Sequence, residues 1–182
     1  MLFHVSEEPG ITRFAPRESR FTDDLVVWAI DREHLRNYLL PRECPRVTFC
    51  AASDSAPADV ARFLGSSRAV VAFEAEWLQR IQETRLCCYH MPDASFECLD
   101  RDAGYYVSRE TVSPVRVDMI EDSIAAIAAT GCEIRILPTL WPLYDAVVAS
   151  SLSYSIIRMQ NAVPRQETQQ AAARRTRPDR TV

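Results

Sequence analysis

Residues 68–91 read RAVVAFEAEWLQRIQETRLCCYHM, and this stretch decides the fold class. Its first six residues form a short apolar run, which predicts a buried strand. Trp77, Leu78 and Ile81 follow at helical spacing, and residues 84–91 return to the alternating character of a strand. Because strand and helix patterns alternate within so short a segment, the sequence predicts an α+β fold with a mixed central sheet and flanking helices.

The same patterns extend in both directions from this stretch. Further strands are expected at residues 2–6, 25–30, 46–50, 104–112 and 132–137. Further helices are expected at residues 31–39, 58–64, 113–131 and 140–159. No repeat or linker interrupts them, so residues 1–162 are interpreted as a single domain.

The clearest helix pattern lies between residues 113 and 131. Ser113 suits the N-cap, and Pro114 suits the first helical position, where its missing N–H costs nothing. Apolar residues then recur at spacings of three and four, which place them on one helical face. These residues are Val117, Ile120, Ile124 and Ile127.

Composition excludes several kinds of mechanism. All 21 basic residues of the 182-residue chain are arginine, so no lysine is present to form a Schiff base or to complete a phosphate-binding P-loop. The four glycines are far apart, which excludes a GxGxxG dinucleotide loop.

Charge is unevenly distributed along the chain. The net charge is −4, but residues 165–182 carry five arginines against two acidic residues, so the remainder is strongly acidic. An acidic body does not suit nucleic-acid binding, so nucleic acid is not expected as a partner; the basic tail is the one segment where RNA contact is an alternative to a solvated end. Residues 163–182 lack apolar periodicity and are interpreted as a disordered tail.

Localisation is expected to be cytoplasmic. The first ten residues lack the basic and apolar regions of a secretory signal. The nearly uncharged residues 136–157 contain two prolines and an aspartate, and are interpreted as a buried helix rather than a membrane span. The six cysteines are therefore expected to be reduced. A zinc site from Cys88, His90 and Cys98 is an alternative, but the spacing matches no common site, so no metal is expected.

Two predicted strands carry polar clusters. Because side chains alternate along a strand, His4 and Ser6 share one face of the first strand. Tyr106, Ser108 and Glu110 share one face of the strand at residues 104–112. If these strands are neighbours, the clusters line one cleft; the alternative is that both are simply solvent-exposed faces.

Most of the chain resembles a family of uncharacterised bacterial proteins of about this length. The matching segments cover most of residues 2–162 and are LFHVSEEPGI, VWAIDREHLRNYLLPRECPRVTF, GYYVSRETVSP and LPTLWPLYDAVVASSLSYSIIRMQNA. This resemblance implies no activity.

Three short motifs also resemble ADP-ribosyltransferase-like domains: LFHVS with its Ile–x–x–Phe turn, VWAIDREHLRNY, and YYVSRETVSP. The resemblance implies that NAD is the substrate of a transferase or an NAD glycohydrolase. It implies that His4 contacts the ribose, that Ser6 holds the nicotinamide side, and that Glu110 is the catalytic carboxylate. Either Tyr38 or Tyr106 would be the aromatic wall of the cleft. Ser108 stands two residues before Glu110, where the resemblance implies a paired Glu or Gln, and is expected among the substrate-binding residues.

Two arginines complete this hypothesis. Arg17 and Arg42 lie near prolines, and a guanidinium can clamp a pyrophosphate without a glycine-rich loop. The alternative to an enzyme is a non-catalytic module that binds a small molecule or a protein.

Overall fold

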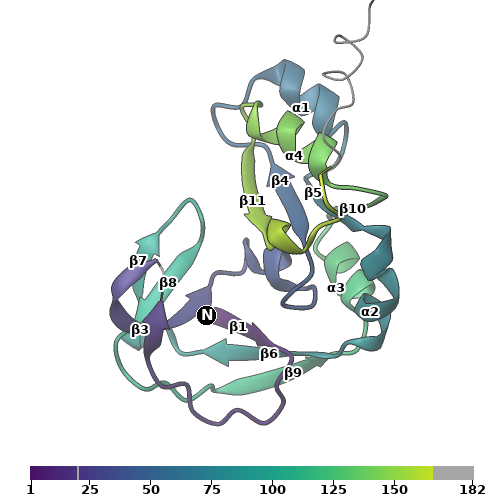
Figure 1. Cartoon of the computed structure of the whole chain (residues 1–182). Coiled ribbons are helices and arrows are strands. Elements are labelled where there is room, and N and C mark those ends of the chain that lie inside the picture. Colours follow the sequence, from purple (N-terminus) through teal and green to yellow (C-terminus); the bar gives the residue numbers. More distant parts are fainter. Residues whose placement is uncertain (20, 166–182) are drawn as a thin grey trace, which may run out of the picture.

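The computed structural model describes residues 1–19 and 21–165 and contains two β-sheets (Figure 1). The larger sheet is antiparallel throughout, and β2 (Arg17–Ser19) extends it by pairing with β3. Its strand order is β7 (Glu97–Asp100), β8 (Tyr105–Ser108), β3 (Thr22–Ile30), β1 (Leu2–Ser6), β6 (Leu86–Met91) and β9 (Arg116–Ile120).

The smaller sheet is mixed, because β10 and β5 pair in parallel while the other pairs are antiparallel. Its strand order is β10 (Glu133–Leu137), β5 (Ala69–Glu74), β4 (Arg46–Cys50) and β11 (Ser153–Ile157). The helices of the described residues are α1 (Pro57–Phe63), α2 (Leu78–Glu83), α3 (Ser123–Ala129) and α4 (Trp141–Val148), with short 3-10 turns η1 (Leu35–Tyr38), η2 (Ala75–Trp77), η3 (Asp93–Ser95) and η4 (Met159–Asn161).

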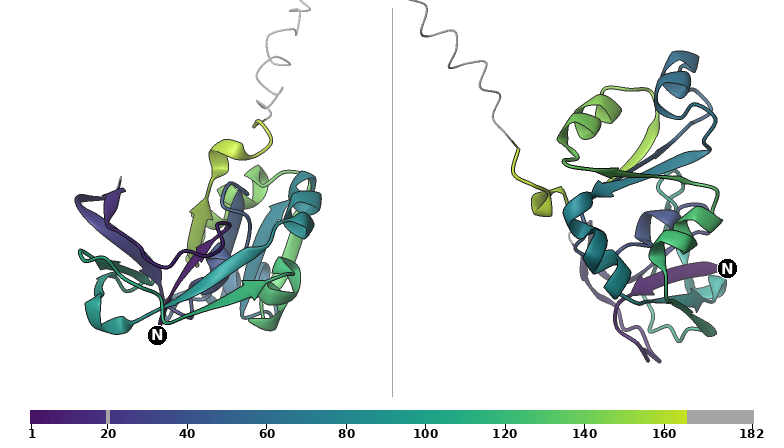
Figure 2. Two further views of the ribbon diagram at one scale, coloured as in Figure 1. Left: turned by 90° about the horizontal axis from the view of Figure 1, so that it is seen from below. Right: turned by 90° about the vertical axis from the view of Figure 1, so that its right-hand side faces the viewer.

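Helices cover both faces of the smaller sheet (Figure 2). On one face, Val70 of β5 packs with Phe63 of α1 and Val147 of α4. On the other face, Val71 packs with Ile81 of α2 and with residues of α3 and η1. Every residue of β5 is therefore buried, which explains the uninterrupted apolar run from Ala69 to Phe73 that precedes Glu74.

The larger sheet also has two distinct faces. Phe14, from the segment between β1 and β2, packs on one face in a cluster with Leu2 and Tyr89. The opposite face carries Phe3 and meets η1. We call these the Phe14 face and the η1 face. The η1 face is turned toward the smaller sheet, because η1 packs against both.

The structure confirms the predicted α+β class, with a mixed sheet flanked by helices. The strands at residues 2–6 and 46–50 have the predicted bounds. The single domain at residues 1–162 stays a prediction. Of the predicted disordered tail, residues 166–182 lie outside the described residues.

Two predicted helices are wrong in part. Residues 116–120 form β9, because Leu86 to His90 of β6 pair with them along their whole length. The helix begins only after Asp122, whose carboxylate accepts a hydrogen bond from the Ala125 N–H at 2.9 Å. Similarly, the helix predicted at residues 140–159 ends with α4, and residues 153–157 pair with β4 as β11.

Candidate functional site

The two polar clusters expected from the sequence lie on one face of the larger sheet. Strands β1 and β8 both pair with β3, on its opposite edges (Figure 1). Phe3 pairs with Ile30, which places His4 opposite Ala29, and Ala29 pairs with Tyr106. Side chains at paired positions share a face, so His4 and Tyr106 both lie on the Phe14 face. The alternation of the strands places Ser6 and Ser108 there as well.

His4 is held in one orientation, in surroundings that favour its neutral form. Its Nδ1 lies 2.9 Å from the backbone oxygen of Trp28, so Nδ1 carries the proton and donates it. The ring packs against Phe14 at a centroid distance of 4.8 Å. Burial lowers the pKa of His4, and the positive charges of Arg42 and Arg17 lower it further. The hydrogen bond to Trp28 raises this pKa but does not offset the burial. Within the described residues Nε2 makes no hydrogen bond, which leaves a lone pair free to accept one.

The lowered pKa predicts acid sensitivity. The pKa of His4 is about 6.5 in the unfolded chain and lower in the folded protein. At pH values between these two pKa values, His4 binds a proton in the unfolded state but not in the folded state. The free energy of unfolding should therefore fall as pH falls below about 6.5. Urea unfolding across pH 5–7 should show a shallower decline for His4→Gln than for the wild type, and equal slopes would contradict the neutral assignment.

Arg17 and Arg42 reach the surroundings of His4 from two different segments. Arg17 begins β2, and Arg42 follows Pro41 in the loop before β4. The backbone N–H of Arg42 donates to the Glu7 carboxylate at 2.7 Å, which fixes the loop to the end of β1. The Arg42 side chain is 80 % exposed and its Nε lies 4.0 Å from the Glu43 carboxylate, so a bound anion would share this guanidinium with Glu43.

Glu110 lies beyond the end of β8, at the rim of the Phe14 face. Its backbone N–H donates to the Oγ of buried Ser108 at 3.2 Å. Two residues later, Val112 pairs with Phe14 and is buried in the same cluster. The strand predicted at residues 104–112 is therefore shorter than expected, yet Glu110 stands between two side chains of this face, with its own side chain exposed.

Tyr38 is not brought to this face. It packs on the η1 face, in the cluster of Phe3 and Ile30. Its hydroxyl donates to the Tyr105 hydroxyl at 3.3 Å, and burial raises its pKa strongly. Of the two tyrosines expected as an aromatic wall, only Tyr106 shares a face with His4, because the sheet separates Tyr38 from it.

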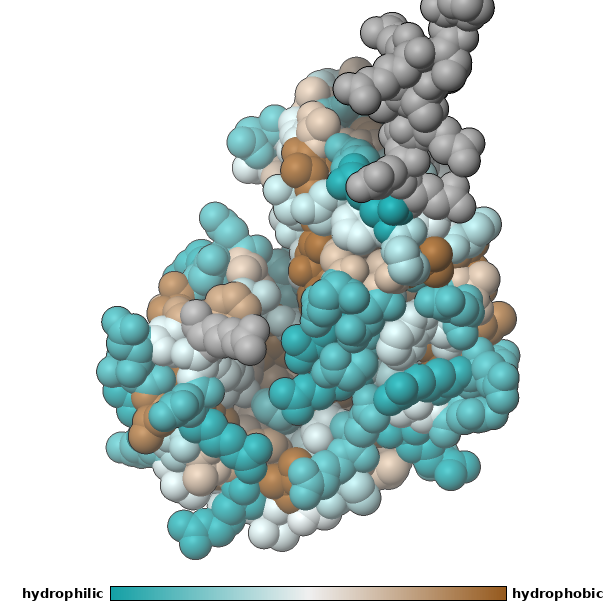
Figure 3. Space-filling model, in the orientation of Figure 1, coloured by the Kyte–Doolittle hydropathy of each residue, from teal (hydrophilic) through white to brown (hydrophobic). Residues whose placement is uncertain are grey.

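A cleft that the sequence did not predict lies on the η1 face, between the two sheets. It has a volume of about 280 Å³ and opens beside β11 and the turn between β7 and β8. Figure 3 shows the surface hollowed between these two parts of the molecule. We call it the inter-sheet cleft. A second cleft of about 270 Å³ lies around Ile11 and Tyr89. Neither is lined by His4 or Glu110.

The cysteine and histidine pair of β6 has a structural role. His90 Nε2 lies 2.8 Å from the Asp118 carboxylate of β9. Burial raises the pKa of Cys88 to about 11, which keeps its thiol protonated and unreactive. Among residues 1–19 and 21–165, no three His, Cys, Asp or Glu side chains gather as a metal site would require.

Comparison with protein families gives one match, over residues 3–162, to a family described as "Family of unknown function (DUF6886)". Neither the curated proteins nor the solved structures contain a match to the chain. Within the described part of the chain, no helix has the length and apolar character needed to span a membrane.

Proposed function

We propose that this chain, which belongs to the DUF6886 family of unknown function, is an ADP-ribosyltransferase-like domain that binds NAD or a related ADP-ribose compound on the Phe14 face. The observation that carries the proposal is the strand order β8-β3-β1. In this order His4 and Tyr106 share one face of the sheet, although they are about a hundred residues apart in sequence. Glu110 follows the end of β8, between Ser108 and Val112.

The protonation state of His4 suits contact with a sugar. Because Nδ1 donates to the Trp28 carbonyl, Nε2 is left as an acceptor, and a ribose hydroxyl is a matching donor. A lowered pKa maintains this state at neutral pH. Arg17 and Arg42 supply positive charge beside the ring, where a pyrophosphate would be stabilised.

The proposed reaction is hydrolysis of the nicotinamide–ribose bond of NAD. The C–N bond breaks and its electron pair leaves with nicotinamide. Water attacks the ribose carbon, forming a new C–O bond and releasing one proton. Positive charge develops on the sugar in the transition state, and the Glu110 carboxylate would stabilise it. Tyr106 offers an aromatic surface to the nicotinamide ring.

Nicotinamide release from NAD tests this proposal. Glu110→Gln keeps the size of the side chain but removes its charge, and the rate should fall by about 10²–10³. Glu121→Gln is the matched control, since Glu121 is an exposed glutamate that pairs with Arg85 away from this face; its rate should equal that of the wild type.

Two outcomes would reject the enzyme. Absence of NAD binding at millimolar concentration in a thermal-shift assay would reject the whole proposal. A thermal shift with NAD but no nicotinamide release, in wild type and variants alike, would reject catalysis and identify a non-catalytic binding module.

A further inference from the structure

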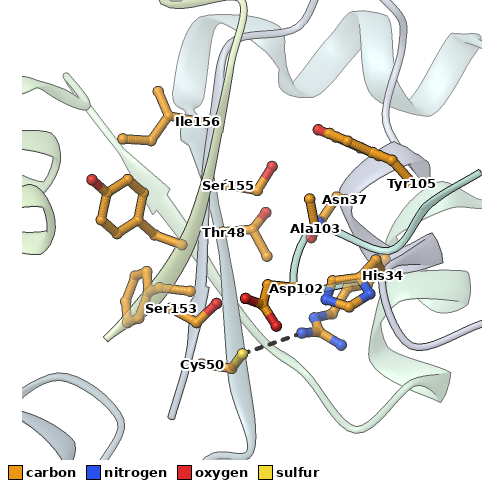
Figure 4. A pocket seen from close by; sticks show the side chains of 13 residues that line it. His34, Asn37, Thr48, Cys50, Asp102, Ala103, Tyr105, Ser153, Ser155 and Ile156 are labelled. Carbon is orange, nitrogen blue, oxygen red and sulfur yellow. Dashed lines mark hydrogen bonds between the residues drawn. The ribbon is translucent and has the colours of Figure 1, made fainter. Parts of the chain in front are cut away.

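The inter-sheet cleft is separated from the His4 site by the larger sheet itself. Tyr105 lines this cleft, while its neighbour Tyr106 lies on the Phe14 face. The cleft walls come from η1, from the end of the β7–β8 turn, and from the paired strands β4 and β11 (Figure 4). A ligand here would occupy a site that is distinct from the one proposed for NAD.

Buried polar groups without partners line this cleft. Thr48 is 2 % exposed and Asn37 is 5 % exposed, yet the Thr48 hydroxyl and the Asn37 amide oxygen make no hydrogen bond among the described residues. Arg36 also lines the cleft, and its buried Nε has no partner within the same residues. A buried polar group that is left unpaired costs about 1–3 kcal/mol, so three at one cleft point to a ligand that satisfies them.

One end of the cleft combines hydroxyls with an aromatic ring. Thr48 pairs with Ser155 across β4 and β11, so their side chains share a face. Figure 4 shows both hydroxyls turned toward Asn37 and Tyr105. An amide and hydroxyls beside an aromatic ring are the groups that bind a planar heterocycle, by stacking and by hydrogen bonds to its edge.

The other end carries a carboxylate and balanced charge. Asp102 and Ser153 lie there in Figure 4, close to His34. Arg36 also lines this cleft. Arg36 donates to the Glu33 backbone oxygen and, at 3.3 Å, to Cys50 Sγ, so it has no carboxylate partner among the described residues. Asp102 adds a negative charge to the same cleft, and a carboxylate is the group that typically accepts hydrogen bonds from sugar hydroxyls.

We propose that the inter-sheet cleft is a nucleoside-binding site. The base lies against Tyr105 with its edge toward Asn37 and Thr48, and the ribose hydroxyls donate to Asp102. The volume of about 280 Å³ is just below the usual range for drug-sized ligands, so it fits a compact ligand without a long phosphate chain. The near balance of charge favours an uncharged nucleoside over a nucleotide.

Titration of the full chain with adenosine, followed by calorimetry, tests this site. Thr48→Val removes the unpaired hydroxyl at nearly constant shape and should weaken adenosine binding about tenfold. Ser123→Ala is the matched control: the Ser123 hydroxyl is also buried and unpaired, but it lies in α3 outside the cleft. Both variants should fold at least as stably as the wild type, and only Thr48→Val should lose affinity.

Further probes separate this proposal from its competitors. Free ribose and free adenine should each bind far more weakly than adenosine, and adenosine monophosphate should bind no more tightly. The proposal would be overturned by no adenosine binding at millimolar concentration, or by equal affinity in Thr48→Val and Ser123→Ala.

The His4 site can fail independently of this one. His4→Ala should leave adenosine affinity unchanged, whatever it does to nicotinamide release. Loss of adenosine binding in His4→Ala would instead assign the nucleoside to the Phe14 face and would reject the second site.

Discussion

Glu74→Ala should lower the free energy of unfolding by about 2–5 kcal/mol. Glu74 is completely buried at the end of β5, and each carboxyl oxygen accepts one backbone N–H. Oε1 accepts from Leu140 at 3.0 Å, where α4 begins, and Oε2 accepts from Val163 at 2.8 Å. The substitution leaves two backbone donors without an acceptor and opens a cavity, so both costs add.

Urea unfolding measures this effect, and two further variants isolate its cause. Glu76→Ala is the matched control, because Glu76 is exposed two residues later and should change stability by less than about 0.5 kcal/mol. Glu74→Gln should lie between the two, since its amide nitrogen cannot accept the second N–H. A Glu74→Ala protein as stable as the Glu76→Ala control would show that Glu74 does not anchor these segments.

Strands that are buried on both faces were predictable from the sequence. Residues 69–73 are wholly apolar, and residues 46–50 alternate Arg46 and Thr48 with Val47 and Phe49; both segments are bounded by turn residues, and both became central strands of the smaller sheet. Burial explains both signals. Helices cover both faces of β5 and leave no polar position in its apolar run. In β4, Val47 and Phe49 pack in the core beneath α1 and α4, while Thr48 lines the inter-sheet cleft.

The helix predicted at residues 113–131 failed because its apparent periodicity spans two elements. Val117 and Ile120 belong to β9, while Ile124 and Ile127 belong to α3. Spacings of three and four therefore arose by coincidence across the turn at Glu121. Pairing with β6 decided the outcome, and pairing between distant segments is invisible to a local pattern.

The candidate site was predictable only along each strand. Alternation correctly grouped His4 with Ser6 and Tyr106 with Ser108, but only the pairing of β1 and β8 with β3 brings the groups together. Tyr38 lies on the other face because η1 packs between the sheets. The inter-sheet cleft had one sequence signal, the polar position Thr48 between the buried apolar residues Val47 and Phe49 of β4.

Gly104→Ala should destabilise the protein by about 2–5 kcal/mol, in two parts. Gly104 has a φ of +69°, which costs an L-residue about 1–2 kcal/mol. The added Cβ would also lie 2.2 Å from His34 Nδ1 and 2.8 Å from Asp31 Oδ2. Neither neighbour moves easily, because Asp31 Oδ1 accepts hydrogen bonds from both the backbone N–H and the ring Nδ1 of His34, each at 2.8 Å. Relieving this overlap costs about 1–3 kcal/mol more.

Gly65→Ala separates the two parts, because Gly65 has a φ of +56° but nothing within 4 Å of an added Cβ. In thermal and urea unfolding, Gly65→Ala should lose only the stability that the positive φ costs. A Gly104→Ala protein no less stable than Gly65→Ala would reject the close contact.

A backbone hydrogen bond also joins the β7–β8 turn to the segment that leads into η1, since the Asp31 N–H donates to the Gly104 carbonyl at 3.1 Å. Gly104→Ala should therefore also weaken adenosine binding, because Asp102 and Tyr105 flank Gly104 and both line the inter-sheet cleft. Gly65→Ala should leave that affinity unchanged.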